Sequence, residues 1–86
     1  MKVRFRKSFS KDFACLDSKI SHAFEMRLKV FFQNPYDAKL SNHPLKGRWQ
    51  GYRSINISGD FRAVYKEIDD ETVIFAAIGS HSQLYG

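Results

Sequence analysis

Three apolar segments in the second half of the chain, separated by two short polar turns, constrain its fold more than any other feature. The segments cover residues 52–57, 61–66 and 72–78. Ser58-Gly59-Asp60 suits a tight hairpin, and residues 68–71 form a second, acidic turn. The three segments are therefore expected to form the strands of an antiparallel meander. The last segment is apolar on both faces, which predicts a central strand.

The N-terminal part of the chain predicts one strand followed by a short helix. Residues 1–7 alternate apolar and cationic side chains, the period-two pattern of a strand with one buried face. Ser8 or Ser10 is expected to cap the helix, because a serine oxygen accepts a free backbone N–H at such a position. The helix is expected to end near Asp17 or Ser18.

A second, longer helix is expected from Ser18 or Lys19 to about Gln33, where Asn34-Pro35 ends it. Its apolar residues recur at helical spacing and form one stripe: Ile20, Ala23, Phe24, Leu28 and Phe31. Two helices joined by almost no linker form a hairpin whose apolar stripes need a partner. The predicted sheet supplies that partner.

The predicted element order is β-α-α-β-β-β in a single domain, residues 1–86. This order defines an α+β layer, with the helical hairpin packed on one face of a small, mostly antiparallel sheet and the other face open. The polar connection 36–50 is expected to be anchored by Leu45 and Trp49, and residues 79–86 show no helical pattern. A pairing of the last strand with the first is a further option that the sequence alone leaves open.

Composition favours a folded, basic, cytoplasmic protein. Of the 86 residues, 43% are hydrophobic and 15% are aromatic, which argues against disorder. A formal net charge of +5 attracts polyanions, with nucleic acid as the leading candidate and an acidic protein as the alternative. The single cysteine, Cys15, excludes an internal disulfide and suits a reducing compartment. No segment approaches the roughly 20 apolar residues of a membrane helix.

Polar residues at the ends of the predicted strands supply candidate chemistry. Asp60 opens the middle strand and His81 follows the last one, and a meander places these two positions side by side. His43, in the preceding connection, is expected to fold over the same edge. Histidine suits the acid and base roles of RNA transesterification because its ordinary pKa is near neutral.

Cations and aromatic rings accompany these groups. The candidate phosphate clamps are Lys46, Arg48, Arg53 and Arg62. Phe61 and Tyr85 are candidates to stack on unpaired bases. The histidines and the cysteine show no zinc spacing, so metal-independent chemistry without a cofactor is predicted.

Each of these residues also has a purely structural interpretation. A histidine after a strand is usually a surface or capping residue, and Asp60 equally suits a residue that shapes its turn. Arg62 alternates with apolar residues, as on a solvated sheet face, and Trp49 fits a core anchor better than a base platform. The convergence of the whole set at one end of the sheet favours phosphate chemistry.

Several motifs resemble the RelE/ParE superfamily of toxins from bacterial type II toxin–antitoxin modules, and its YafQ-like branch most closely. They are His43-Pro44-Leu45-Lys46-Gly47, Gly51-Tyr52-Arg53, residues 60–66 and residues 79–85. The resemblance implies a ribosome-dependent mRNA endonuclease, an mRNA interferase, that halts translation and is silenced by a cognate antitoxin in a hetero-oligomer. By the same resemblance, His81 corresponds to the main acid/base group and His43 to the loop histidine. Asp60 corresponds to the aspartate that opens the middle strand, Phe61 to the aromatic residue after it, and Tyr85 to the terminal aromatic residue.

Two positions depart from the YafQ-like pattern. Asn56 stands where a further histidine is usual, and an amide cannot exchange a proton near neutral pH. Ala77 stands where an arginine is usual and cannot hold a phosphate. Two alternatives therefore stay open: a ParE-like toxin that inhibits gyrase and cuts no RNA, and an attenuated relative that only binds its antitoxin.

Overall fold

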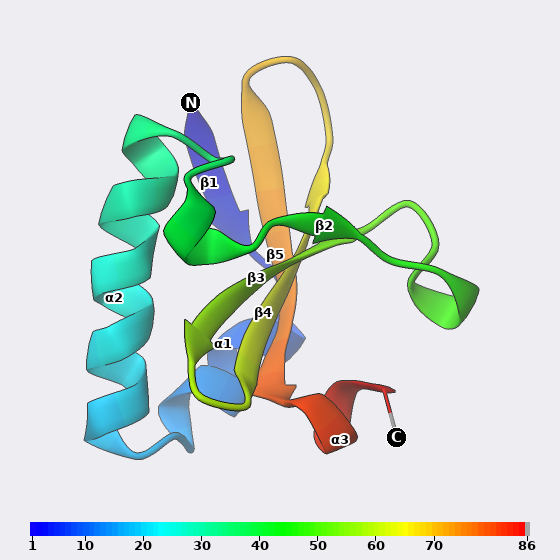
Figure 1. Ribbon diagram of the computed structural model, residues 1–86. Helices are drawn as coiled ribbons and strands as arrows, with labels where there is room; N and C mark the ends of the chain where they lie inside the picture. Colours follow the sequence, from blue (N-terminus) through cyan, green and yellow to red (C-terminus); the bar gives the residue numbers. More distant parts are fainter. Residues whose placement is uncertain (86) are drawn as a thin grey trace.

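The computed structural model describes residues 1–85 and contains one five-stranded sheet in the order β1-β5-β4-β3-β2 (Figure 1). The strands are β1 (Lys2–Phe5), β2 (His43–Pro44), β3 (Arg53–Ser58), β4 (Phe61–Glu67) and β5 (Thr72–Ser80). The helices are α1 (Lys7–Ala14), α2 (Ser18–Gln33) and α3 (His81–Tyr85), with the short 3-10 turns η1 (Ala38–Leu40) and η2 (Gly47–Trp49). The predicted α+β class and the β-α-α-β-β-β core are confirmed.

Strands β3, β4 and β5 form the predicted antiparallel meander. The option left open by the sequence is realised, because β1 pairs with β5 in parallel, with Lys2 opposite Thr72 and Phe5 opposite Phe75. Strand β5 thus has a neighbour on both sides, which agrees with the interior position predicted from its two apolar faces.

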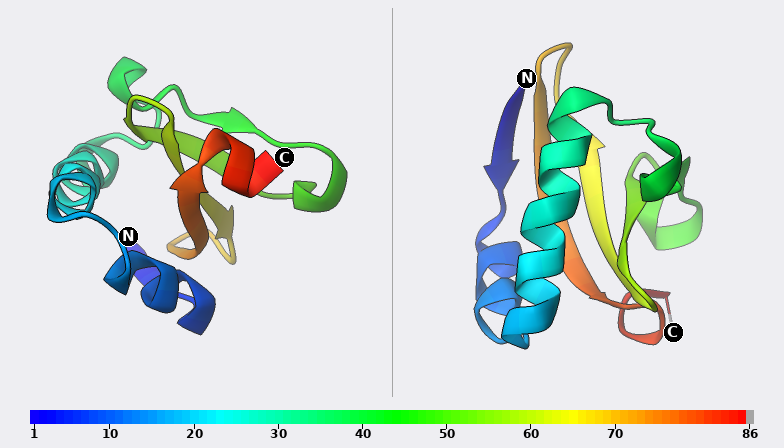
Figure 2. Two further views of the ribbon diagram at one scale, coloured as in Figure 1. Left: turned by 90° about the horizontal axis from the view of Figure 1, so that it is seen from below. Right: turned by 60° about the vertical axis from the view of Figure 1, so that its left-hand side comes forward.

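Helices α1 and α2 pack on one face of the sheet, as the right-hand view of Figure 2 shows. Helix α2 begins at Ser18 and ends at Gln33, within the predicted bounds, and the Asp17 carboxylate caps it by accepting the Lys19 N–H at 2.8 Å. The predicted serine cap of α1 is wrong. Helix α1 begins at Lys7, so its N-cap residue is Arg6, which makes no side-chain cap. Ser8 lies within the first turn, where its hydroxyl donates to the Ala76 carbonyl at 3.3 Å.

Aromatic side chains fill the core between these helices and the sheet. Phe75 on β5 is fully buried and lies at its centre, with ring centroids 5.5 Å from Phe24, 5.6 Å from Phe31 and 5.4 Å from Tyr65. Aromatic pairs at such separations add to the free energy of burial. This core holds α1 and α2 against one face of the sheet, so that other segments can pack on the opposite face.

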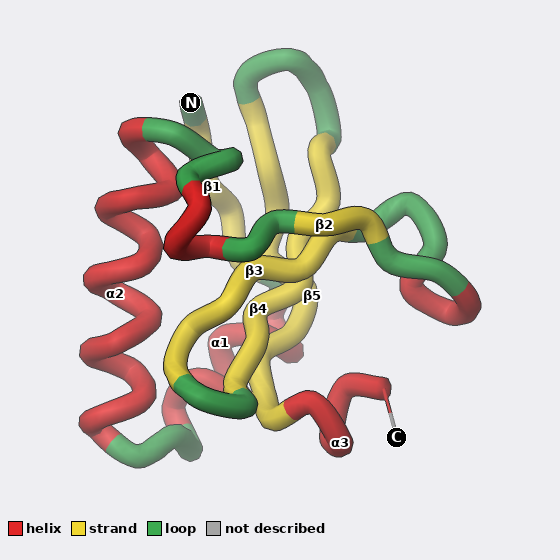
Figure 3. Tube along the Cα trace, in the orientation of Figure 1, coloured by secondary structure: helices red, strands yellow, loops and turns green. Residues whose placement is uncertain are grey.

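Two segments that were expected to be irregular form regular structure. Within the connection 36–50, β2 adds an edge strand to the sheet, and the tail forms the short helix α3 (Figure 3). The face predicted to be open is partly covered as a result. Leu84 of α3 is buried against Val64 and Ala77, and Leu45 and Trp49 pack on this second cluster. The two predicted anchors are thus confirmed, on the face opposite α1 and α2.

Among the described residues, no helix combines the length and apolar character needed to cross a lipid bilayer.

Candidate active site

One row of side chains runs across the sheet beneath α3. Ser54 lies opposite Val64, Val64 lies opposite Ala77, and His43 of β2 lies opposite Ser54. Directly opposite residues of antiparallel strands share a face of the sheet. Since Val64 and Ala77 pack against Leu84, the whole row faces away from α1 and α2.

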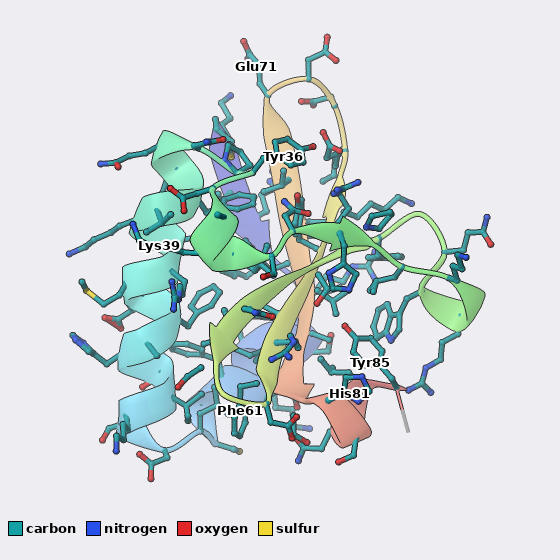
Figure 4. All side chains as sticks on the ribbon, viewed as in Figure 1. Tyr36, Lys39, Phe61, Glu71, His81 and Tyr85 are labelled. Atoms are coloured by element: carbon teal, nitrogen blue, oxygen red, sulfur yellow. The ribbon has the colours of Figure 1, made fainter. Side chains whose placement is uncertain are left out.

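Helix α3 places His81 and Tyr85 over this row, and Figure 4 shows the two side chains close to each other. Their ring centroids are 4.8 Å apart in an edge-to-face arrangement. The Tyr85 hydroxyl donates to Oγ of the fully buried Ser54 at 3.0 Å. At the other end of α3, the His81 backbone N–H donates to the Asp60 carbonyl at 3.0 Å. Contacts therefore connect Asp60, His81, Tyr85 and Ser54, and the strand register extends this series to His43.

A reciprocal capping arrangement begins α3. The Gln83 side-chain oxygen accepts the Ser80 N–H at 2.8 Å, and the Ser80 hydroxyl accepts the Gln83 N–H at 3.3 Å. Gly79 makes room for this arrangement, because a Cβ at that position would lie 2.8 Å from the Gln83 oxygen. A serine followed three residues later by glutamine is a recognisable helix-start signal, so the sequence did contain a marker of α3.

The far end of α3 is held by the connection 36–50. The Trp49 indole N–H donates to the Leu84 carbonyl at 3.0 Å, and the Arg48 guanidinium donates to the same oxygen. Helix termini leave such carbonyl groups without an intrahelical partner. Arg48, predicted as a phosphate clamp, thus also positions the helix that carries Tyr85.

His43 is exposed, and a contact with the backbone indicates which of its ring nitrogens carries a proton. Its Nδ1 lies 2.8 Å from the Ser41 carbonyl oxygen, which can only accept a hydrogen bond, so Nδ1 carries a proton. In the neutral ring Nε2 is then a free acceptor, the form that a general base requires.

Basic residues surround a depression beside Tyr85. A cavity of about 420 Å³ is lined by Lys46, Gly47, Arg48, Trp49 and Tyr85. Arg62 lies opposite Asn56 and Gly79 in the strand register, and its Nη1 donates to the Gly59 and Phe61 carbonyls. The other guanidinium nitrogens of Arg62 have no such contact in the described part of the chain, and arginine has donors enough to bind an anion as well.

The structure separates two predicted residues from this group. Arg53 donates through Nε to the Asn42 side-chain oxygen at 2.7 Å, and its guanidinium lies 5.3 Å from the Tyr36 ring centroid. Phe61 is half-buried against the core on the side of α1 and α2, and Figure 4 shows it at the β3–β4 turn, apart from Tyr85. The physical reason is strand alternation, which gives Arg53 and Phe61 the face opposite to Ser54 and Arg62.

Sequence reasoning missed Ser54, Gln83 and the positioning role of Trp49. The capping sequence could have pointed to Gln83, whereas the burial of Ser54 depends on α3 folding over it. Within residues 1–85, no three His, Cys, Asp or Glu side chains are grouped as metal ligands would be. The arrangement offers two imidazoles and a phenol for proton transfer, bordered by cations that attract phosphate.

Solved structures with this fold define a class of small RelE/ParE-like toxins from bacterial type II toxin–antitoxin systems. The crystal structure of YafQ from Escherichia coli strain BL21(DE3) is 25% identical, covers 99% of this chain and 98% of that chain, and superposes with a TM-score of 0.82. The toxin in the crystal structure of the E. coli DinJ-YafQ toxin–antitoxin complex is 28% identical, covers 99% of this chain and 97% of that chain, and has a TM-score of 0.73.

A sequence profile described as "Bacterial toxin of type II toxin-antitoxin system, YafQ" matches residues 1–86, and the chain belongs to this family. The mRNA interferase toxin YafQ of E. coli strain K12 is 36% identical over 52 residues, which are 60% of this chain and 55% of that protein. The aligned part thus spans about half the length of this curated relative. The resemblance to the YafQ-like branch is confirmed.

Proposed function

We propose that this protein is the toxin of a type II toxin–antitoxin module and acts as a cytoplasmic endoribonuclease that cuts mRNA on the ribosome. The observation that carries the proposal is the connected series from Asp60 through His81 and Tyr85 to Ser54 and His43, on the sheet face opposite α1 and α2. Membership of the YafQ family supports it, since a curated relative is named an mRNA interferase.

The proposed reaction is metal-independent transesterification. A base accepts the proton of a ribose 2′-OH, which attacks the adjacent phosphate, and an acid protonates the leaving 5′ oxygen. His81 is the principal proton-transfer group, and the free Nε2 of His43 supplies the second. The Asp60 carbonyl fixes the backbone at His81, and the Asp60 carboxylate is exposed in the adjacent turn.

Cations at the border of the site stabilise the negative charge that builds on the phosphorane. Lys46 and Arg48 line the cavity beside Tyr85, and Arg62 lies across the sheet from Asn56. Tyr85 offers an aromatic ring for stacking on a base. Arg53 and Phe61 remain predicted RNA contacts, but their positions on the other face favour structural roles.

The two departures from the family pattern lie on the same face as His81. Asn56 is opposite Arg62, so the guanidinium and the amide can hold one phosphate together. Ala77 is buried beneath Leu84, where its small side chain lets α3 pack directly on the sheet. In this proposal Arg62 supplies charge that Ala77 cannot.

The decisive experiment maps mRNA ends in a reconstituted translation reaction. Wild-type protein is expected to produce cuts in ribosome-bound mRNA, and His81→Ala is expected to lower their rate by about 10²-fold or more, the lower end of the usual contribution of a positioned acid or base. His22→Ala changes an exposed histidine of α2 and serves as the matched control. Equal cutting by His81→Ala and His22→Ala would remove His81 from the mechanism.

A ParE-like action on gyrase is the second candidate, favoured by the absence of a cation at Ala77. Expression of such a toxin would produce DNA breaks with intact mRNA. The YafQ of the DinJ-YafQ complex is bound to an antitoxin, and we propose an antitoxin partner and a hetero-oligomer for this chain as well. Loss of toxicity on coexpression with the neighbouring reading frame would support that assignment, and undiminished toxicity would contradict it.

A further inference from the structure

A second group of cations lies on the same face of the sheet, organised by the ring of Tyr52. The Arg6 guanidinium donates through Nη2 to the Tyr52 hydroxyl at 2.7 Å, and its Cζ lies 5.5 Å from the ring centroid. Lys66 Nζ lies 5.5 Å from the same centroid. The Trp49 ring meets Tyr52 edge-to-face at 5.3 Å. We call Arg6, Tyr52 and Lys66 the Tyr52 cluster.

Three distant segments of the chain build the Tyr52 cluster. Arg6 follows β1 and is fixed there by its backbone N–H, which donates to the Phe75 carbonyl at 2.9 Å. Tyr52 immediately precedes β3 and packs with Val64 and Leu84, which places it on the face that carries α3. Lys66 lies two residues after Val64 on β4 and therefore projects from that same face.

The cluster is continuous with the proposed active site. Trp49 contacts the Tyr52 ring, donates a hydrogen bond to the Leu84 carbonyl, and lines the cavity that Tyr85 also lines. An RNA strand bound at His81 and Tyr85 that continues past Trp49 would therefore reach Arg6 and Lys66.

The chemistry of the Tyr52 cluster fits an anion. Arg6 and Lys66 are both exposed, and within residues 1–85 their side-chain contacts described above are with an aromatic ring and its hydroxyl rather than with a carboxylate. Arg6 and Lys66 bring two positive charges to the surroundings of one ring, and an anion bound at this surface is attracted by both. Because Arg6, Lys66 and Trp49 already surround the Tyr52 ring, the ring orients the cations and is not free to stack on a base.

We infer that the Tyr52 cluster is a second phosphate subsite, which grips the backbone of the RNA strand that flanks the cleaved linkage. This inference rests on the proposed function and adds to it a sequence-independent contact, since phosphate contacts position a nucleic acid and base contacts specify its sequence. The occupant is single-stranded RNA, because the subsite continues from a pocket proposed to hold the cleaved strand.

The test measures binding of a single-stranded RNA whose 2′ positions are methylated, so that cleavage cannot interfere. The double variant Arg6→Gln/Lys66→Gln is expected to bind on the order of tenfold more weakly, and the slope of log affinity against log salt is expected to decrease in magnitude by about 1.4, the value for two lost phosphate contacts on a single strand. Lys19→Gln/Lys29→Gln removes the same charge from exposed positions on α2 and is expected to leave the slope unchanged.

A charge-preserving exchange separates loss of the subsite from loss of folding. Arg6→Lys/Lys66→Arg keeps both cations and is expected to restore most of the affinity and the full salt slope. Equal effects of the two glutamine pairs, or no effect of Arg6→Gln/Lys66→Gln, would overturn the subsite. Weakened antitoxin binding with unchanged RNA binding would overturn it as well and assign the surface to the antitoxin.

The outcome is separable from the proposed nuclease activity. In a His81→Ala background, which is expected to lose cutting, Arg6→Gln/Lys66→Gln is still expected to decrease the magnitude of the salt slope by about 1.4. A wild-type protein that cuts no RNA but still shows the loss of affinity in Arg6→Gln/Lys66→Gln would refute the nuclease and leave the phosphate subsite standing.

Discussion

The effect of Gly79→Ala on the free energy of unfolding should depend on the side chain at position 83. A Cβ added at Gly79 would lie 2.8 Å from the Gln83 side-chain oxygen, which is closer than packed atoms tolerate. The Gln83 amide must therefore swing away, which breaks its bond to the Ser80 N–H. Loss of such a capping contact costs about 0.5–2 kcal/mol.

An opposing effect acts through the unfolded chain. Alanine restricts the unfolded state more than glycine does, which stabilises the folded state by about 0.4–1 kcal/mol where the backbone geometry is compatible. Gly79 lies inside β5 and has no positive φ, so its backbone suits alanine. In the wild-type background the two effects oppose each other, and the net effect of Gly79→Ala is expected to lie between about 0.5 kcal/mol stabilising and about 1.6 kcal/mol destabilising.

In a Gln83→Ala background only the second effect remains. The Gln83 Cβ lies 3.4 Å from the added methyl group, an ordinary contact, so Gly79→Ala is expected to stabilise by about 0.4–1 kcal/mol there. The coupling free energy between the two positions is then about 0.5–2 kcal/mol. Urea unfolding of the four proteins, followed by far-ultraviolet circular dichroism, measures it. A coupling of zero would refute the role assigned to Gly79.

Two further predictions concern the face that carries α1 and α2. Burial raises the pKa of the Tyr65 phenol above its ordinary value, so the unfolded state releases this proton first and stability should fall as pH rises above about 10; Tyr65→Phe should weaken that alkaline decline in chemical unfolding, and an unchanged decline would contradict the role of Tyr65. Arg53→Gln should lower stability by about 1 kcal/mol through its lost bond to Asn42, without weakening RNA binding as Arg62→Gln does; equal losses of RNA affinity would contradict the separation of Arg53 from the site.

The sequence was sufficient for the elements that repeat a pattern over many residues. The stripe of α2 and the turn at Ser58-Gly59-Asp60 fixed the helical hairpin and the meander, and the meander brought Asp60 beside His81 as predicted. Parallel pairing of β1 with β5 was left open because residues 2–5 and 72–75 are far apart in the chain. Local patterns carry no information on such a distant register.

The separation of Arg53 and Phe61 from the other predicted contacts has a different cause. Both lie at the ends of strands that also carry candidate residues, and the sequence analysis expected the whole set to converge at one end of the sheet. Strands alternate their side chains, so a shift of one residue moves a group to the opposite face. Face assignment required the structure, because apolar residues occupy both faces of β4 and β5.

The second face of the sheet shows why α3 matters more than its five residues suggest. A buried Ser54 hydroxyl and a buried Leu84 both depend on this helix, and the same helix carries His81 and Tyr85. Trp49 holds its far end and also supports Tyr52, so the contacts that fix the proposed catalytic groups extend to Arg6 and Lys66. With alanine at position 77, positive charge is distributed around the border of this face instead of lying beneath α3. Such a border suits an extended strand of RNA, whose phosphates are spaced along its length, better than it suits a single isolated anion.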